Sequence, residues 1–120
     1  MIENKKANVF VYGTLKEGYG NHGCLENSPR ITEGWLCGFE MWQNGIPYVR
    51  RSNDPESKVY GEVYEANWDT VLGSLDILEG HPRFYEREFI SDQLGGVWVY
   101  LCKSGSQFVK SGVWDHNRFY

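Results

Sequence analysis

Two short segments of the chain carry residues that could do chemistry. In the first, an apolar, β-prone run at residues 9–11 breaks at Tyr12-Gly13-Thr14-Leu15, so the backbone can turn there with its amides free. Successive N–H groups in such a turn form a concavity that holds a carboxylate or an oxyanion. The second segment supplies Glu79, directly before Gly80-His81-Pro82. A desolvated glutamate has a raised pKa and can accept a proton from an amine and later return it.

Each segment alone has a simpler interpretation. The loop is compatible with an ordinary turn after a buried strand, and Glu79 with a solvated residue at the end of a helix. Their combination favours a site in which the loop binds an anionic group and Glu79 transfers protons. We therefore expect the Glu79 side chain to face the backbone of Gly13, Thr14 and Leu15 across one cavity.

The two segments together resemble the γ-glutamylcyclotransferase-like (AIG2-like) family, which is marked by a Tyr-Gly-(Ser/Thr)-Leu loop and a distant catalytic glutamate. Residues 9–16, followed by Gly18 and Asn21-His22, are most similar to the γ-glutamylamine cyclotransferase branch. Weaker similarity extends over residues 59–64, 98–100 and 111–114.

The resemblance implies a small β-barrel enzyme in which Glu79 is the catalytic general base and acid. The implied substrate-binding residues are Tyr12, Gly13, Thr14, Leu15 and Tyr85. The implied reaction releases 5-oxoproline and a free amine from a γ-glutamyl amide. The substrate's own α-amine is the nucleophile, so no cofactor or metal is needed. Two alternatives stay open: a non-catalytic module that binds small carboxylates or amines, and a cyclotransferase that acts on a larger γ-glutamylated metabolite.

The elements that must position these residues are mostly strands. After the first strand, residues 16–30 form a long loop rich in glycine and asparagine, a type that is often functional. Turn residues then separate apolar runs along the rest of the chain. The predicted strands cover residues 34–42, 48–51, 58–64, 84–90 and 97–103, and a short strand or tail carries Val113-Trp114.

One helix is predicted, at residues 67–79. Asn67 can cap its start, and Gly80 and Pro82 end it. Its apolar face, at helical spacing, comprises Trp68, Val71, Leu72, Leu75 and Leu78. Strands in succession with a single inserted helix indicate an α+β fold, in which a mixed, mostly antiparallel sheet curls into a barrel.

Length and composition limit the function classes. A chain of 120 residues predicts a single domain, residues 1–120, with its own core. The formal charge of −4 gives no attraction to phosphate backbones or anionic lipid, so we expect no nucleic-acid or membrane partner. Without a signal peptide or an apolar run of membrane-spanning length, the expected location is the cytoplasm. The oligomeric state stays open.

The cysteines and histidines give no sign of a metal or redox site. Cys24, Cys37 and Cys102 are widely spaced and are expected to be reduced thiols. The histidines, at positions 22, 81 and 116, lack the spacing of a helical metal site.

Three polar residues near the two segments have open roles. Asn21 and His22 are either polar contacts at the edge of the pocket or parts of a surface loop. Arg87 shares a strand face with Tyr85 and is a candidate ion-pair partner of Glu62 or Glu65.

Overall fold

The computed structural model describes residues 5–114. Its helical segments are a 3-10 turn, η2 (His22–Leu25), and one continuous helix made of α1 (Trp68–Thr70), the π-helical η3 (Val71–Leu75) and α2 (Asp76–Glu79). Its strands are β1 (Lys6–Val11), β2 (Arg30–Cys37), β3 (Phe39–Gln43), β4 (Pro47–Arg51), β5 (Lys58–Asn67), β6 (Glu86–Ile90), β7 (Val97–Leu101) and β8 (Gln107–Phe108).

The strands form two sheets and do not close into the predicted barrel. The larger sheet has the order β2-β5-β1-β7-β6, and only β1 and β7 pair in parallel. The smaller sheet has the order β4-β3-β8 and is antiparallel. The predicted strand 34–42 is in fact split between the two sheets. Gly38 has a φ of 82°, in the left-handed region that favours glycine, so β3 leaves the larger sheet.

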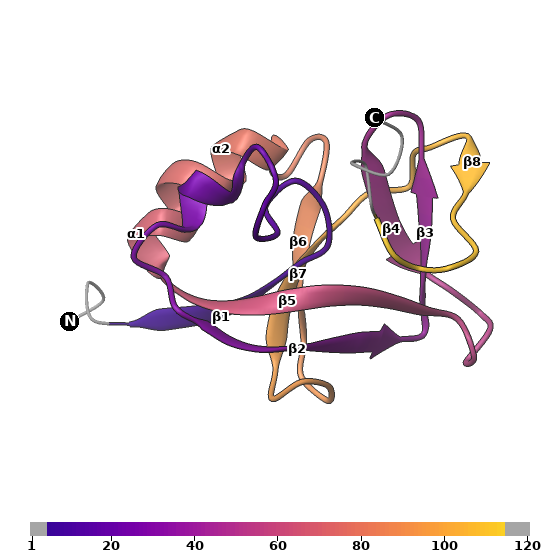
Figure 1. Cartoon of the computed structure of the whole chain (residues 1–120), viewed down its shortest axis with the longest axis horizontal. Coiled ribbons are helices and arrows are strands. Elements are labelled where there is room, and N and C mark those ends of the chain that lie inside the picture. Colours follow the sequence, from indigo (N-terminus) through magenta and orange to yellow (C-terminus); the bar gives the residue numbers. More distant parts are fainter. Residues whose placement is uncertain (1–4, 115–120) are drawn as a thin grey trace.

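β1 lies at the centre of the larger sheet and contributes to both cores, because its side chains alternate between the two faces. Val9 and Val11 belong to the core under the helix, whereas Phe10 belongs to the core shared with the smaller sheet. Figure 1 shows the helix along one side of β1 and β5, with β3, β4 and β8 grouped at the other end of the molecule. The helix contributes Val71 and Leu75 to the first core, and the smaller sheet contributes Phe39, Met41 and Val49 to the second.

The helix begins and ends as predicted within one residue, but two details of the prediction are wrong. Asn67 makes no capping hydrogen bond from its side chain, because it is the last residue of β5 and pairs with Lys6. Leu72 and Leu78 are 53% and 41% exposed and so do not belong to the buried face. That face instead runs from Val71 and Leu75 to Glu79, which is half-buried at the end of α2.

The remaining strands differ from the prediction mainly at their ends. β5 extends three residues further than predicted and leads directly into the helix, whereas β6 and β7 are shorter than the predicted strands. Residues 113–114 form no strand, and the last strand of the described chain is β8. None of the helices within residues 5–114 is long and apolar enough to span a bilayer.

Candidate active site

One pocket of about 240 Å³ lies where the end of β1, the end of α2 and the β3–β4 turn meet. It is lined by Phe10, Val11, Tyr12, Gly13, Thr14, Leu15, Asn21, Ile46, Pro47, Leu78, Glu79, Phe84, Tyr85 and Tyr100. The fold therefore brings Glu79 and the loop at residues 12–15 to the same cavity, as the sequence predicts. All of the predicted site residues line it.

The loop keeps its carbonyl oxygens occupied and its amides free. The Gly13 carbonyl accepts from the Lys16 N–H at 3.0 Å, and the Thr14 carbonyl accepts from the Asn21 N–H at 2.9 Å. The Leu15 carbonyl accepts from His22 Nδ1 at 2.9 Å, which requires the tautomer with the proton on Nδ1. The N–H groups of Gly13, Thr14 and Leu15 donate to no residue in the described range 5–114. This arrangement suits an oxyanion or a carboxylate in the pocket.

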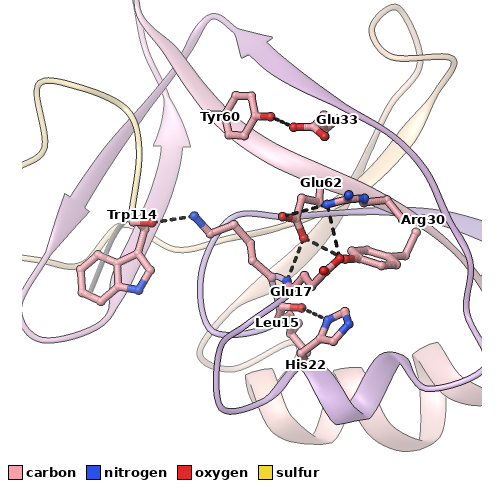
Figure 2. A network of polar contacts seen from close by, with 10 residues as sticks. Leu15, Glu17, His22, Arg30, Glu33, Tyr60, Glu62 and Trp114 are labelled. Atoms are coloured by element: carbon pink, nitrogen blue, oxygen red, sulfur yellow. Dashed lines mark hydrogen bonds and ion pairs between the residues drawn. The ribbon is translucent and has the colours of Figure 1, made fainter. Parts of the chain in front are cut away.

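The loop is anchored to the larger sheet through the carboxylate of Glu62 on β5 (Figure 2). Glu62 Oε1 accepts hydrogen bonds from the Glu17 N–H at 2.9 Å and from the Tyr64 hydroxyl at 2.8 Å. Arg30 on β2 lies 3.3 Å from Glu62 Oε2 and completes the cluster. These contacts fix the far end of the loop, so the amides at residues 13–15 are held in place before any ligand binds.

Two residues whose roles the sequence left undecided lie in the segment that follows the loop at residues 12–15. Asn21 lines the pocket, and its Nδ2 donates to Thr14 Oγ1 at 2.9 Å. His22 does not line the pocket, because its ring contacts Tyr64 edge-on and its Nδ1 holds Leu15. Asn21 is therefore available to a ligand, whereas His22 supports the loop from behind.

Glu79 has the environment of a proton-transfer group. Its side chain follows Val71 and Leu75 along the buried face of the helix, and burial raises its pKa from 4.5 to about 7. No donor among the described side chains forms a hydrogen bond with its carboxyl group. The carboxyl group is therefore free to exchange protons with a ligand near neutral pH.

The backbone of Glu79 is fixed by the segment that follows the helix. Gly80 adopts a φ of 70° and ends the helix, and the Tyr85 N–H donates to the Glu79 carbonyl at 3.2 Å. Tyr85 is buried, and its hydroxyl donates to the Pro47 carbonyl at 2.7 Å. The helix end, the pocket wall and β4 are thereby joined at Tyr85.

Tyr12 forms another part of the pocket wall. Its hydroxyl donates to the Tyr100 carbonyl at 2.5 Å. Burial raises the pKa of both Tyr12 and Tyr85 well above the ordinary value, so both phenols stay neutral. Since the hydroxyl hydrogens of both residues are already donated to backbone carbonyls, these tyrosines shape the wall and do not offer free O–H donors to a ligand.

An ion pair that sequence analysis missed involves Asp76, three residues before Glu79 on the helix. Arg87 pairs with Asp76, and not with Glu62 or Glu65 as anticipated from the sequence. The Tyr100 hydroxyl also donates to Asp76 Oδ1, at 2.6 Å. Burial alone would raise the pKa of Asp76, but the hydrogen bonds from Arg87 and Tyr100 outweigh it and lower that pKa. In the sequence, Asp76 stands out only by its position one residue after Leu75, at the edge of the apolar face, where an acidic residue is usually solvated.

The described residues offer little to a metal ion or to redox chemistry. Within residues 5–114, no group of three or more His, Cys, Asp or Glu side chains is arranged to hold a metal. Cys24, Cys37 and Cys102 form no disulfide. His116, one of the histidines considered above, lies outside the described residues.

The fold and the pocket define an α+β domain in which a carboxyl group with a raised pKa and the backbone of residues 13–15 line one cavity. Residues 9–116 match the family described as gamma-glutamyl cyclotransferase, AIG2-like. A Methanocaldococcus jannaschii protein named "Putative gamma-glutamylcyclotransferase" is 45% identical over 118 residues, covering 92% of this chain and 97% of that protein. The chain therefore belongs to the γ-glutamylcyclotransferase, AIG2-like family, as its motifs predict.

Solved structures agree with this assignment. An uncharacterized protein from Pyrococcus horikoshii superposes with a TM-score of 0.79 at 25% identity, covering 94% of this chain and 93% of that one. An AIG2-like protein from Mus musculus has the same fold, with a TM-score of 0.68 at 24% identity and coverage of 93% and 90%. This chain therefore shares its overall fold with both proteins.

Proposed function

We propose that the protein is a γ-glutamylamine cyclotransferase that converts a γ-glutamyl amide into 5-oxoproline and a free amine, with Glu79 as general base and acid. One observation carries the proposal: the half-buried carboxyl group of Glu79, with a pKa of about 7, lines the same cavity as residues 13–15, whose backbone amides donate to none of the described residues. The family membership supports the same reaction class.

In the proposed reaction the nucleophile belongs to the substrate. The α-amino nitrogen attacks the γ-carbonyl carbon and closes a five-membered ring, while Glu79 takes a proton from that nitrogen. The bond from the γ-carbon to the departing nitrogen then breaks, and Glu79 returns its proton to the departing amine. Because both reacting groups belong to one molecule, the enzyme avoids the entropy cost of a bimolecular encounter.

In this scheme the loop amides stabilise the negative charge of the substrate. The N–H groups of Gly13, Thr14 and Leu15 bind the glutamyl carboxylate or the oxyanion that develops on the γ-carbonyl oxygen. Removing one such donor typically costs about 2.7–4 kcal/mol in transition-state stabilisation. Asn21, which lines the pocket beside Thr14, supplies a further polar contact.

The test is product analysis with a panel of γ-glutamyl amides. The expected products are 5-oxoproline and the amine in equal amounts, resolved by chromatography. Release of free glutamate would mean that water is the nucleophile and would contradict the cyclisation. Saturable binding by calorimetry without any product, for every amide in the panel, would indicate the non-catalytic binding module instead.

A further inference from the structure

The outer rim of the pocket is apolar and is open to solvent. Three of the lining residues are large hydrophobic side chains with substantial exposure: Ile46 at 41%, Leu78 at 41% and Phe84 at 50%. They come from the β3–β4 turn, the last turn of the helix and the segment before β6. Exposed apolar side chains that converge on one opening from separate segments are typical of a ligand-binding surface.

Phe84 is held rigidly in spite of its exposure. Its ring contacts Tyr85 edge-on, with a centroid distance of 5.0 Å, and contacts Tyr48 edge-on at 5.9 Å. Tyr48 and Tyr85 are themselves stacked at 5.6 Å with an interplanar angle of 10°. The Phe84 N–H donates to the Gly80 carbonyl at 2.9 Å, which fixes the backbone as well. A fixed aromatic platform at the rim loses little entropy when it binds an apolar group.

The lining offers no cation to a negatively charged substituent. Glu79 is the only Asp, Glu, Lys or Arg residue among the lining residues. Because its pKa is about 7, its carboxyl group is only partly ionised at neutral pH. Arg83, the cation nearest to Phe84 in the sequence, is exposed and does not line the pocket. A carboxylate or an ammonium group in contact with these three apolar side chains would give up part of its hydration, and no lining side chain offers a full opposite charge in exchange.

The volume of the pocket indicates which part of the substrate it encloses. About 240 Å³ is below the range of about 300–1,000 Å³ that is usual for pockets enclosing a drug-sized ligand. The cavity therefore suits one amino-acid-sized group, which in the proposed function is the glutamyl part beside Glu79 and the loop amides. The substituent on the departing nitrogen then extends over the rim.

We infer that Ile46, Leu78 and Phe84 determine specificity and bind an apolar substituent, so that the substrates are γ-glutamyl amides of small alkyl or aryl amines. Amides whose amine part carries a carboxylate or an ammonium group within one or two carbons of the departing nitrogen are then poor substrates. This inference rests on the proposed function, because it takes the glutamyl group to lie at Glu79.

The first experiment compares kcat/KM for four amides: γ-glutamyl-n-butylamide, γ-glutamylbenzylamide, γ-glutamylglycine and the mono-γ-glutamyl amide of ethylenediamine, which carries an ammonium group two carbons from the scissile nitrogen. The butyl and benzyl amides are expected to exceed the other two by at least about tenfold. Within an n-alkyl series, each methylene that reaches the rim should raise kcat/KM up to about fourfold. Equal or faster turnover of the glycine or ethylenediamine amide would overturn the inference.

Single substitutions test whether the rim residues cause the preference for apolar amines. Phe84→Ala should lower the benzylamide-to-glycine ratio of kcat/KM by about five- to tenfold. Phe89→Ala is the matched control, because Phe89 is also 50% exposed but lies on β6 against Trp98, outside the pocket. Ile77→Ala, at a 75% exposed position beside Leu78, is the control for Leu78→Ala. A ratio that changes equally in variants and controls would contradict the assignment.

Affinity measurements distinguish a failure of the inference about the rim from a failure of the proposed function. If no amide yields 5-oxoproline, the proposed function fails, and calorimetry on the Glu79→Gln variant still measures the order of affinity for the four amides. Tighter binding of the butyl and benzyl amides supports the apolar rim, and equal affinities overturn it. If the rim is covered by a second copy of the chain, Phe84→Ala should lower the mass seen by light scattering and leave the substrate ratio unchanged, which would also overturn it.

Discussion

The guanidinium group of Arg87 donates two hydrogen bonds to the carboxylate of Asp76, from Nε at 2.8 Å and from Nη2 at 3.0 Å. The same guanidinium lies 5.4 Å from the ring centre of Trp68 and 5.3 Å from that of Trp98. Asp76 is three residues before Glu79 on the helix. The pair therefore fixes the helical turn that carries the proposed general base.

Arg87→Met should destabilise the protein by about 3 kcal/mol, because it leaves the buried carboxylate of Asp76 without its charged partner. The measurement is the free energy of unfolding in urea at pH 7. Arg51→Met is the matched control: Arg51 pairs with Glu88 at 3.1 Å, but its side chain is 61% exposed. An exposed pair contributes only about 0–1 kcal/mol. Equal losses in the two variants would show that the Asp76 pair has no special role.

The loop itself can be tested at Gly13. A Cβ atom at this position would lie 2.7 Å from Pro47 Cγ, so Gly13→Ala must shift either the loop or the start of β4. We expect kcat/KM to fall about 10- to 100-fold, since the amides at residues 13–15 then miss their target. Gly20→Ala lies in the same loop with open space around its Cβ and should leave the steady-state kinetics unchanged.

Glu79→Gln should keep the fold and the affinity for γ-glutamyl amides but lower kcat by about 10²–10⁴, the usual contribution of a general base. Stopped assays of 5-oxoproline give the rate, and circular dichroism checks the fold. Glu86→Gln, at an exposed position at the start of β6, serves as the control and should retain full activity. Undiminished turnover by the Glu79 variant would move the chemistry to another group.

The rate should also follow the protonation of Glu79. Because its pKa is about 7, kcat/KM should fall tenfold per pH unit below pH 7 as the carboxylate becomes protonated. At higher pH, kcat/KM should rise a second time, because the α-ammonium group of the substrate loses its proton and becomes the nucleophilic amine. In the Glu79→Gln variant, the limb near pH 7 should disappear and the substrate limb should persist. A limb near pH 7 that survives in this variant would assign it to a different residue.

The sequence predicted the shared cavity better than the shape around it. Glycine after an apolar run and the helical spacing from Leu75 to Glu79 are local signals, and the two segments they indicated line the same pocket. The barrel was wrong because residues 34–42 look like one strand, whereas the left-handed conformation of Gly38 divides it. That division creates β3, which starts a second sheet with β4 and β8.

Asp76 and Phe84 could not be assigned from the sequence for a different reason. An acidic residue at the edge of a helical apolar face is usually solvated, and Asp76 is buried only because Arg87 and Tyr100 reach it from β6 and β7. Likewise, Phe84 belongs to the rim only because Tyr48 and Tyr85 meet beside it. Both roles arise from contacts between segments, which spacing along the chain does not encode.

Burial of Glu79 should also be visible in the stability of the protein. The folded state raises its pKa from 4.5 to about 7, so the folded protein binds this proton more tightly than the unfolded chain does. The contribution of the neutral Glu79 carboxyl group to the free energy of unfolding is therefore fully present below pH 4.5 and is lost as the pH rises through 7. Glu79→Gln, which cannot ionise, should be more stable than the parent protein by about 3 kcal/mol at pH 8 and equal to it near pH 4.5. Urea titrations of both proteins at the two pH values make the comparison, and a difference independent of pH would show that Glu79 ionises normally and lacks the raised pKa its proposed role requires.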